Sequence, residues 1–153
     1  MLFYNCSLNF FFHLIIIINL NVKQYIYIMQ HQEITGEIIG SAIRIHKKLG
    51  PGLLENVYKE CMFYELKKSG LNVSKEVSLP VKYDDVILES GYRLDLLVEK
   101  QIIVELKTVD FIHEKHIAQL LTYLKLSNNK LGLLINFNEV TLKDGLKRVV
   151  NNY

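Results

Sequence analysis

The chain has 153 residues, of which 50% are hydrophobic and 22% charged, enough for one globular domain with a sizeable core. Its formal net charge of +2 is too small to indicate a nucleic-acid partner by itself. The two cysteines, Cys6 and Cys61, form neither a disulfide framework nor a metal-ligand spacing, so we expect a reducing, cytoplasmic compartment.

Residues 1–28 differ from the rest, since they contain no acidic residue, one lysine, and mostly Phe, Ile, Leu, Asn and Tyr. Their densest apolar run, Phe10 to Ile18, is shorter than the roughly 20 residues of a membrane helix, and a signal-peptide pattern is missing. Three interpretations stay open: an extra hydrophobic element, a weak membrane anchor, or translated sequence upstream of a true start at Met29. The third is favoured. We therefore expect one domain over residues 29–153 and no membrane partner.

Two helices are predicted before any strand. The first begins near Glu33, and Gly50-Pro51-Gly52 ends it. The second should run from Leu53 to Lys68, before Ser69-Gly70. Apolar residues at helical spacing define the two buried stripes: Ile38, Ala42, Ile45 and Leu49, then Leu54, Val57, Cys61 and Tyr64.

Three strands in a meander are predicted next, over residues 73–83, 86–98 and 102–109. Asp84-Asp85 forms the first turn, and Glu99-Lys100-Gln101 forms the second connection. A helix over 113–127, a buried strand over 130–137 and a short closing helix over 141–150 complete the chain. This order predicts an α/β fold in which helices pack against a mixed sheet.

Three charged side chains fall inside the predicted hairpin GYRLDLLVEKQIIVELK. If its loop has three residues, Val98 lies opposite Ile102, and the same register sets Asp95 opposite Glu105. Lys107 follows two residues later on the same face. The inference depends on register, because a two- or four-residue loop would place the two carboxylates on opposite faces.

Two adjacent carboxylates repel each other unless a cation lies between them, and such oxygen ligands suit Mg²⁺ or Mn²⁺. The alternative is a surface ion-pair ladder with Lys107 between Asp95 and Glu105, and on these three residues alone the ladder is favoured. Two other helices carry residues that bear on this choice. Glu55 stands in a first helical turn, where the helix dipole also favours an acid, and Gln119 and Tyr123 lie four residues apart on one helix face.

Gly52, Glu55 and Tyr58 in GLLENVY resemble the signature of the GxxExxY protein family, which looks like a branch of the PD-(D/E)XK nuclease superfamily. The likeness runs from about Ile34 to Val150 and includes GYRLDLLV, VELK, QLLTYLK and LGLLINF. It implies a restriction-endonuclease-like αβββαβ core, with a mixed central sheet flanked by helices, plus an extra N-terminal helix. Among superfamily members, those similar to RecB and lambda exonuclease resemble this chain best.

The resemblance also implies a role for each residue. Asp95 and Glu105 correspond to the metal-binding carboxylates and Lys107 to the lysine of the motif, although Leu94 replaces the proline that often precedes the aspartate. The expected metal ligands are Glu55, Asp95, Glu105 and the backbone carbonyl of Leu106. The expected catalytic residues are Asp95, Glu105, Lys107, Glu55, and the Gln119 and Tyr123 of a QxxxY motif.

The function implied by the resemblance is a Mg²⁺- or Mn²⁺-dependent nuclease that hydrolyses phosphodiester bonds. Its partner would be nucleic acid, with DNA favoured, and no small-molecule cofactor is expected. The alternative is a catalytically silent module of the same fold that binds nucleic acid or another protein, because fold membership does not settle function.

Overall fold

The computed structural model describes residues 4–151, with side chains from Asn19 onward except at positions 25, 27, 28 and 90. It divides into two compact units, Met1–Gly36 and Glu37–Tyr153. The first contains the N-terminal part of helix α1 (Tyr4–Leu49), and the second contains the rest of α1 and every later element. The apolar run at residues 10–18 lies outside the described side chains, and a true start at Met29 stays a prediction.

Helix α1 begins at Tyr4, well before Glu33, where the predicted helix began. No glycine or proline occurs between Tyr4 and Thr35, so no residue in this stretch interrupts helical hydrogen bonding. The helix ends where it was predicted to end, because Gly50 takes a φ of +69°. Within the described residues, no helix is both long and apolar enough to cross a membrane.

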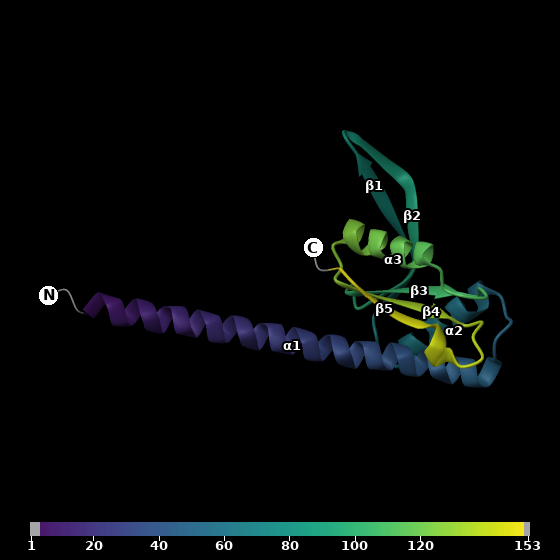
Figure 1. Cartoon of the computed structure of the whole chain (residues 1–153), viewed down its shortest axis with the longest axis horizontal. Coiled ribbons are helices and arrows are strands. Elements are labelled where there is room, and N and C mark those ends of the chain that lie inside the picture. Colours follow the sequence, from purple (N-terminus) through teal and green to yellow (C-terminus); the bar gives the residue numbers. More distant parts are fainter. Residues whose placement is uncertain (1–3, 152–153) are drawn as a thin grey trace. The chain divides into compact units, whose positions relative to one another are not determined.

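The described part of the second unit is built on a five-stranded sheet with the order β1-β2-β3-β4-β5. Strands β3 and β4 are parallel, and the other neighbours are antiparallel. Figure 1 shows helices α2 (Glu55–Lys68) and α3 (Glu114–Ser127) packed beside this sheet, which confirms the predicted α/β class. The strands are β1 (Val73–Tyr83), β2 (Val86–Val98), β3 (Ile102–Lys107), β4 (Leu131–Asn136) and β5 (Leu146–Val150).

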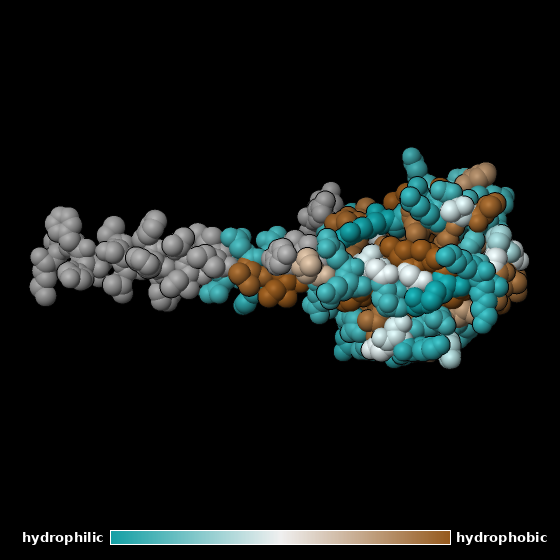
Figure 2. All heavy atoms as spheres, turned by 90° about the horizontal axis from the view of Figure 1, so that it is seen from below, coloured by the Kyte–Doolittle hydropathy of each residue, from teal (hydrophilic) through white to brown (hydrophobic). Residues whose placement is uncertain are grey.

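Both faces of the sheet are covered at β3. Ile103 packs in a core cluster with Leu120 of α3. The alternate residues Ile102, Val104 and Leu106 point to the other face and have no exposed surface. The charged residues of β3 therefore lie in a largely buried strand. Figure 2 shows the outside of the domain, where hydrophilic side chains surround hydrophobic ones.

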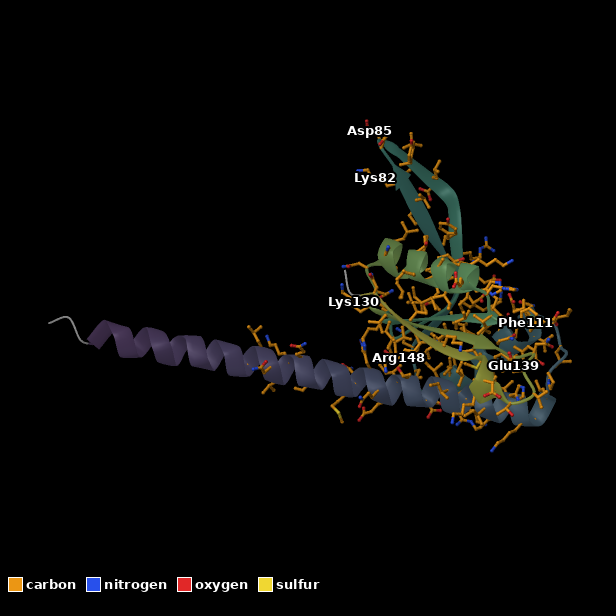
Figure 3. All side chains as sticks on the ribbon, in the orientation of Figure 1. Lys82, Asp85, Phe111, Lys130, Glu139 and Arg148 are labelled. Carbon is orange, nitrogen blue, oxygen red and sulfur yellow. The ribbon has the colours of Figure 1, made fainter. Side chains whose placement is uncertain are left out.

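Strands β1 and β2 extend beyond the rest of the sheet as a two-stranded arm, residues 81–92. Strand β2 pairs with β3 only from Leu96 to Val98, whereas it pairs with β1 as far as the turn. Figure 3 shows Lys82 and Asp85 at the tip of this arm, away from α3 and the other strands. Its exposed hydrophobic side chains are Tyr83, Val86, Ile87, Leu88 and Tyr92.

The pairing of β2 with β3 has the predicted register. Val98 lies opposite Ile102, as a three-residue loop requires. Three residues further along each strand, the same register sets Asp95 opposite Glu105, just past the last paired residues. The two carboxylates therefore belong to one face of the sheet.

The turn that fixes this register contains left-handed residues without a glycine. Lys100 has a φ of 56°, which costs a residue with a Cβ atom about 1 kcal/mol. We expect Lys100→Gly to stabilise the domain by a few tenths to about 1 kcal/mol, because relief of this strain outweighs the greater freedom of glycine in the unfolded chain. Urea unfolding measures the change. Lys100→Ala is the control, since it removes the same charge and keeps the Cβ atom, and equal stability of the two variants would contradict the prediction.

The predicted closing helix over residues 141–150 is wrong. A short 3-10 helix, Leu142–Gly145, is followed there by strand β5, which pairs with the free edge of β4. The chain turns tightly at Gly145, where a Cβ atom would come within 2.5 Å of the Asn136 carbonyl oxygen. The β-branched pair Val149-Val150 then favours a strand.

Strand β3 ends at Lys107 rather than at the predicted Val109. The reason is Asn136, which is completely buried at the end of β4. Its side chain accepts the N–H of Val109 (3.1 Å) and donates to the carbonyl of Val109 (2.7 Å), so these groups leave the sheet ladder. The segment after Lys107 is thereby tied to β4.

Candidate active site beside the end of β3

Asp95 is held where β2 and β3 stop pairing. Its Oδ2 accepts the backbone N–H of Leu106 at 2.9 Å, and its Oδ1 lies 3.6 Å from Lys59 Nζ. One oxygen of the carboxylate therefore accepts a backbone N–H of β3 in place of a neighbouring strand. The ammonium group of Lys59 lies beside the other oxygen. The contact with β3 uses the N–H of Leu106 and does not involve its carbonyl group. That the Leu106 carbonyl is a metal ligand therefore stays a prediction.

Glu105 is only 3% exposed, although it is charged. One of its oxygens, Oε1, accepts a hydrogen bond from Lys107 Nζ at 2.7 Å, while the buried Oε2 has no partner within the described residues. Burial raises the pKa of Glu105 to about 7, the negative charge of Asp95 adds to the rise, and Lys107 opposes it. Glu105 is thus a carboxylate with one unsatisfied oxygen beside a second carboxylate.

Glu55 opens helix α2 at the same place. Burial raises its pKa, and the charge of Asp95 also raises it, against the opposing effects of Lys107, Lys59 and a hydrogen bond from the Thr108 backbone. Glu55 therefore lies within electrostatic reach of Asp95, Lys107 and Lys59, although it comes from another element. Its role as a metal ligand stays a prediction.

The loop before α2 explains how Glu55 is positioned. The hydroxyl of Tyr58, a completely buried residue, donates to the carbonyl of Gly50 (2.5 Å) and accepts the N–H of Leu53 (3.2 Å). Between them Gly52 has a φ of +96°, which favours glycine. Gly52 and Tyr58 thus fold the loop that delivers Glu55 to the site.

Gln119 and Tyr123 form one hydrogen-bonded unit on α3. Gln119 Nε2 donates to Tyr123 Oη at 2.5 Å, and the side chain of Tyr123 is 3% exposed. Burial raises the pKa of Tyr123, and the negative charge of Glu105 raises it further. The charge of Glu105 thus acts on the phenol, while the role that the QxxxY resemblance implies for Gln119 and Tyr123 stays a prediction.

Lys59 is a residue of the site that the sequence analysis missed. Its Nζ lies 3.1 Å from Glu76 Oε1 and 3.6 Å from Asp95 Oδ1. Burial lowers the pKa of Lys59, but the hydrogen bond to Glu76 and the charge of Asp95 outweigh this effect. The spacing of Glu55 and Lys59, four residues apart on one helix, was the available signal.

The fit of the site to a divalent cation can be tested on its residues. No three His, Cys, Asp or Glu side chains within the described part of the chain are arranged to hold a metal, and the charges of Lys59 and Lys107 balance the carboxylates instead. Two observations nevertheless fit a cation. Glu105 has a buried oxygen without a partner, and the charge of Asp95 disfavours ionisation of Glu105 unless positive charge is added.

A family model described as the PD-(D/E)XK nuclease superfamily matches residues 32–149. One similar solved structure is titled "Crystal structure of SSO0001", with 16% sequence identity and a TM-score of 0.44. The alignment covers 73% of this chain and 62% of that one, and it is too distant to support an argument. No curated protein matches at the significance threshold.

Proposed function

Because the chain belongs to the PD-(D/E)XK nuclease superfamily, with its restriction-endonuclease-like fold, we propose that it is a Mg²⁺- or Mn²⁺-dependent nuclease. Its substrate would be nucleic acid, with DNA favoured. The observation that carries the proposal is the buried Glu105, which has one oxygen bonded to Lys107 and one without a partner, beside Asp95. A charged group is rarely buried in this state unless another ligand completes it.

The chemistry divides between the cation and the side chains of the chain. Asp95 and Glu105 would hold the cation, with Glu55 and the Leu106 carbonyl as further ligands. When bound, the cation would lower the pKa of a water and neutralise charge on the phosphate. Lys107, already placed against Glu105, would stabilise negative charge that develops on the phosphate oxygens.

Tyr123 and Gln119 would position the nucleic-acid backbone. Since Gln119 Nε2 donates to Tyr123 Oη, the phenol proton stays available for another acceptor. The raised pKa of Tyr123 keeps this proton in place at neutral pH. A phosphate oxygen is the acceptor that such a donor would orient.

We also propose the narrower family assignment, to the GxxExxY proteins and the members similar to RecB. The support is physical. Gly52 provides the positive φ, and the Tyr58 hydroxyl bonds to both sides of the loop. The loop leads into Glu55, whose pKa the charge of Asp95 helps to raise, so the three spaced residues belong to one local structure.

The test is cleavage of labelled single- and double-stranded DNA and RNA with Mg²⁺, with Mn²⁺ and with EDTA. We expect Asp95→Asn to reduce cleavage on the order of 100-fold or more, the scale of losing one preorganised electrostatic group. Asp85→Asn, the same change at the tip of the arm, should leave it unchanged (Figure 3). Equal cleavage by the wild type and Asp95→Asn would overturn the proposal.

One observation favours the second candidate, a silent module that binds nucleic acid without cutting it. Lys59 and Lys107 already balance Asp95 and Glu105, and no three-ligand group forms within the described residues. Binding of oligonucleotides without cleavage, together with no binding of Mg²⁺ or Mn²⁺ in a calorimetric titration, would select this candidate.

A further inference from the structure

A pocket of about 340 Å³ opens directly after the Glu-x-Lys segment of β3. Its lining comes from the loop that follows Lys107 and from the first turn of α3, and it includes Asp110, Phe111, His113, Lys115 and His116. Figure 3 places Phe111 on the body of the domain, far from the tip of the arm. None of these lining residues has a role in the proposed cleavage chemistry.

Three rings form a row along this pocket. The Phe111 side chain is 63% exposed and meets the His113 ring nearly edge-on, with centroids 5.3 Å apart. His113 in turn lies 5.7 Å from the His116 ring. The backbone N–H of His113 donates to His116 Nδ1 at 3.2 Å, so the last imidazole has a fixed orientation. A single exposed phenylalanine is common, but one that extends a row of rings in a pocket offers a stacking surface.

The row leads to the candidate active site. Thr108 lines the pocket and directly follows Lys107 in the chain, so the pocket opens one residue from the lysine of the site. The positive charge of Lys107 also lowers the pKa of His116, after the larger effect of burial. A group in the pocket would therefore be adjacent to a phosphate placed at Lys107.

The charges of the pocket decide which group fits. Asp110 contributes a carboxylate that repels a phosphate, whereas it can accept a hydrogen bond from the exocyclic amino group of a base. The largely exposed ring of Phe111 suits a flat π-system. Lys115 adds one positive charge for the backbone that would lead away from the base.

We propose that this pocket holds one unpaired nucleobase, stacked on Phe111, of the strand whose phosphodiester lies at Asp95 and Glu105. The inference rests on the proposed function for the position of that phosphate. It narrows the substrate to single strands, or to ends and junctions with an unpaired nucleotide, because a base inside a duplex cannot reach a side pocket without leaving its stack.

The experiment measures binding in EDTA, so that it does not depend on cleavage. Fluorescence anisotropy compares labelled single-stranded DNA, single-stranded RNA and a blunt DNA duplex. We expect Phe111→Ala to weaken single-strand binding by about 5- to 100-fold, the scale of one base–aromatic stack, and duplex binding by less than about 2-fold. Phe111→Trp should retain single-strand binding. Tyr83→Ala is the control, since it removes an equally exposed aromatic ring from the arm.

The outcomes separate this proposal from the proposed function. Single-strand binding that depends on Phe111, in a protein that cuts nothing, would support the pocket and remove the nuclease. Metal-dependent cleavage in a protein whose single-strand binding ignores Phe111→Ala would do the reverse. Equal weakening for strand and duplex, or no binding by the wild type, would overturn the pocket. Single-stranded DNA and single-stranded RNA both offer an unpaired base. The one that binds more tightly therefore identifies the sugar that the protein prefers.

Discussion

Glu105→Gln will make the metal-free protein more stable at alkaline pH while abolishing the proposed cleavage. In the folded protein burial and the charge of Asp95 raise the pKa of Glu105 from its ordinary 4.5 to about 7. Each pKa unit is worth about 1.4 kcal/mol, so ionised Glu105 costs on the order of 3 kcal/mol of folding free energy. Glutamine has the shape of the protonated acid and avoids this cost.

The sign of the pH dependence follows from proton binding. Between pH 4.5 and about 7 the folded protein holds a proton on Glu105 that the unfolded chain has lost. Stability of the wild type therefore falls as pH rises through this window. The difference between Glu105→Gln and the wild type should grow across the window and then level off.

The measurement is urea unfolding in EDTA at a series of pH values. Glu89→Gln serves as the control, because it makes the same chemical change on the exposed arm and should show no such window. Added Mg²⁺ should raise the stability of the wild type more than that of Glu105→Gln, since the cation neutralises the carboxylates. A stability difference that stays constant across the pH series would contradict this account of Glu105.

Tyr58→Phe should destabilise the domain by about 1–3 kcal/mol, the scale of two lost hydrogen bonds, although it removes a single oxygen. The substitution leaves the part-buried carbonyl of Gly50 and N–H of Leu53 without the hydroxyl that bonds to both. The stack of Tyr58 on Phe137, with centroids 4.3 Å apart, is retained. Because the same loop positions Glu55, we also expect weaker cleavage.

Thermal and urea unfolding, together with the cleavage assay, measure both effects. The stripe predicted to be buried on this helix is wrong, since Leu54, Val57 and Tyr64 are exposed and the buried residues are Tyr58, Met62 and Leu66. Tyr64→Phe, on the same helix but 64% exposed, is therefore the matched control and should change stability by less than about 0.5 kcal/mol. A loss of stability without any loss of cleavage would show that Tyr58 supports only the fold. Equal stability of Tyr58→Phe and Tyr64→Phe would show that the hydrogen bonds from Tyr58 to the loop contribute nothing to the stability of the domain.

The carboxylate pair could be predicted because the information is local. Once the loop is taken to have three residues, the position of Asp95 opposite Glu105 follows from counting, and the structure has that register. The length of the loop was the one element that the sequence left open. The strand β5 could not be distinguished from a helix, since five residues carry too little periodicity. Its pairing with β4, across a loop and the 3-10 helix Leu142–Gly145, left no mark in the local sequence.

The contact between Lys59 and Glu76 could not be predicted, for a different reason. Glu76 takes a φ of 55° within β1, a conformation that its sequence neighbours do not signal. The pairing of β1 with β2 passes from Lys75 to Val77, and Glu76 lies between them beside Lys59. A contact that depends on such an irregular backbone becomes visible only in three dimensions.

The arm of residues 81–92 has a consequence for handling the protein at high concentration. Two strands without outer neighbours present unpaired backbone groups, and hydrophobic side chains such as Tyr83 and Ile87 surround them. Strand addition between molecules begins at such edges. Pro80 removes one backbone donor, and the charges of Lys82 and Asp85 penalise close stacking. Substitutions that replace Pro80, or that remove the charges of Lys82 and Asp85, would make this arm the first place where the protein aggregates.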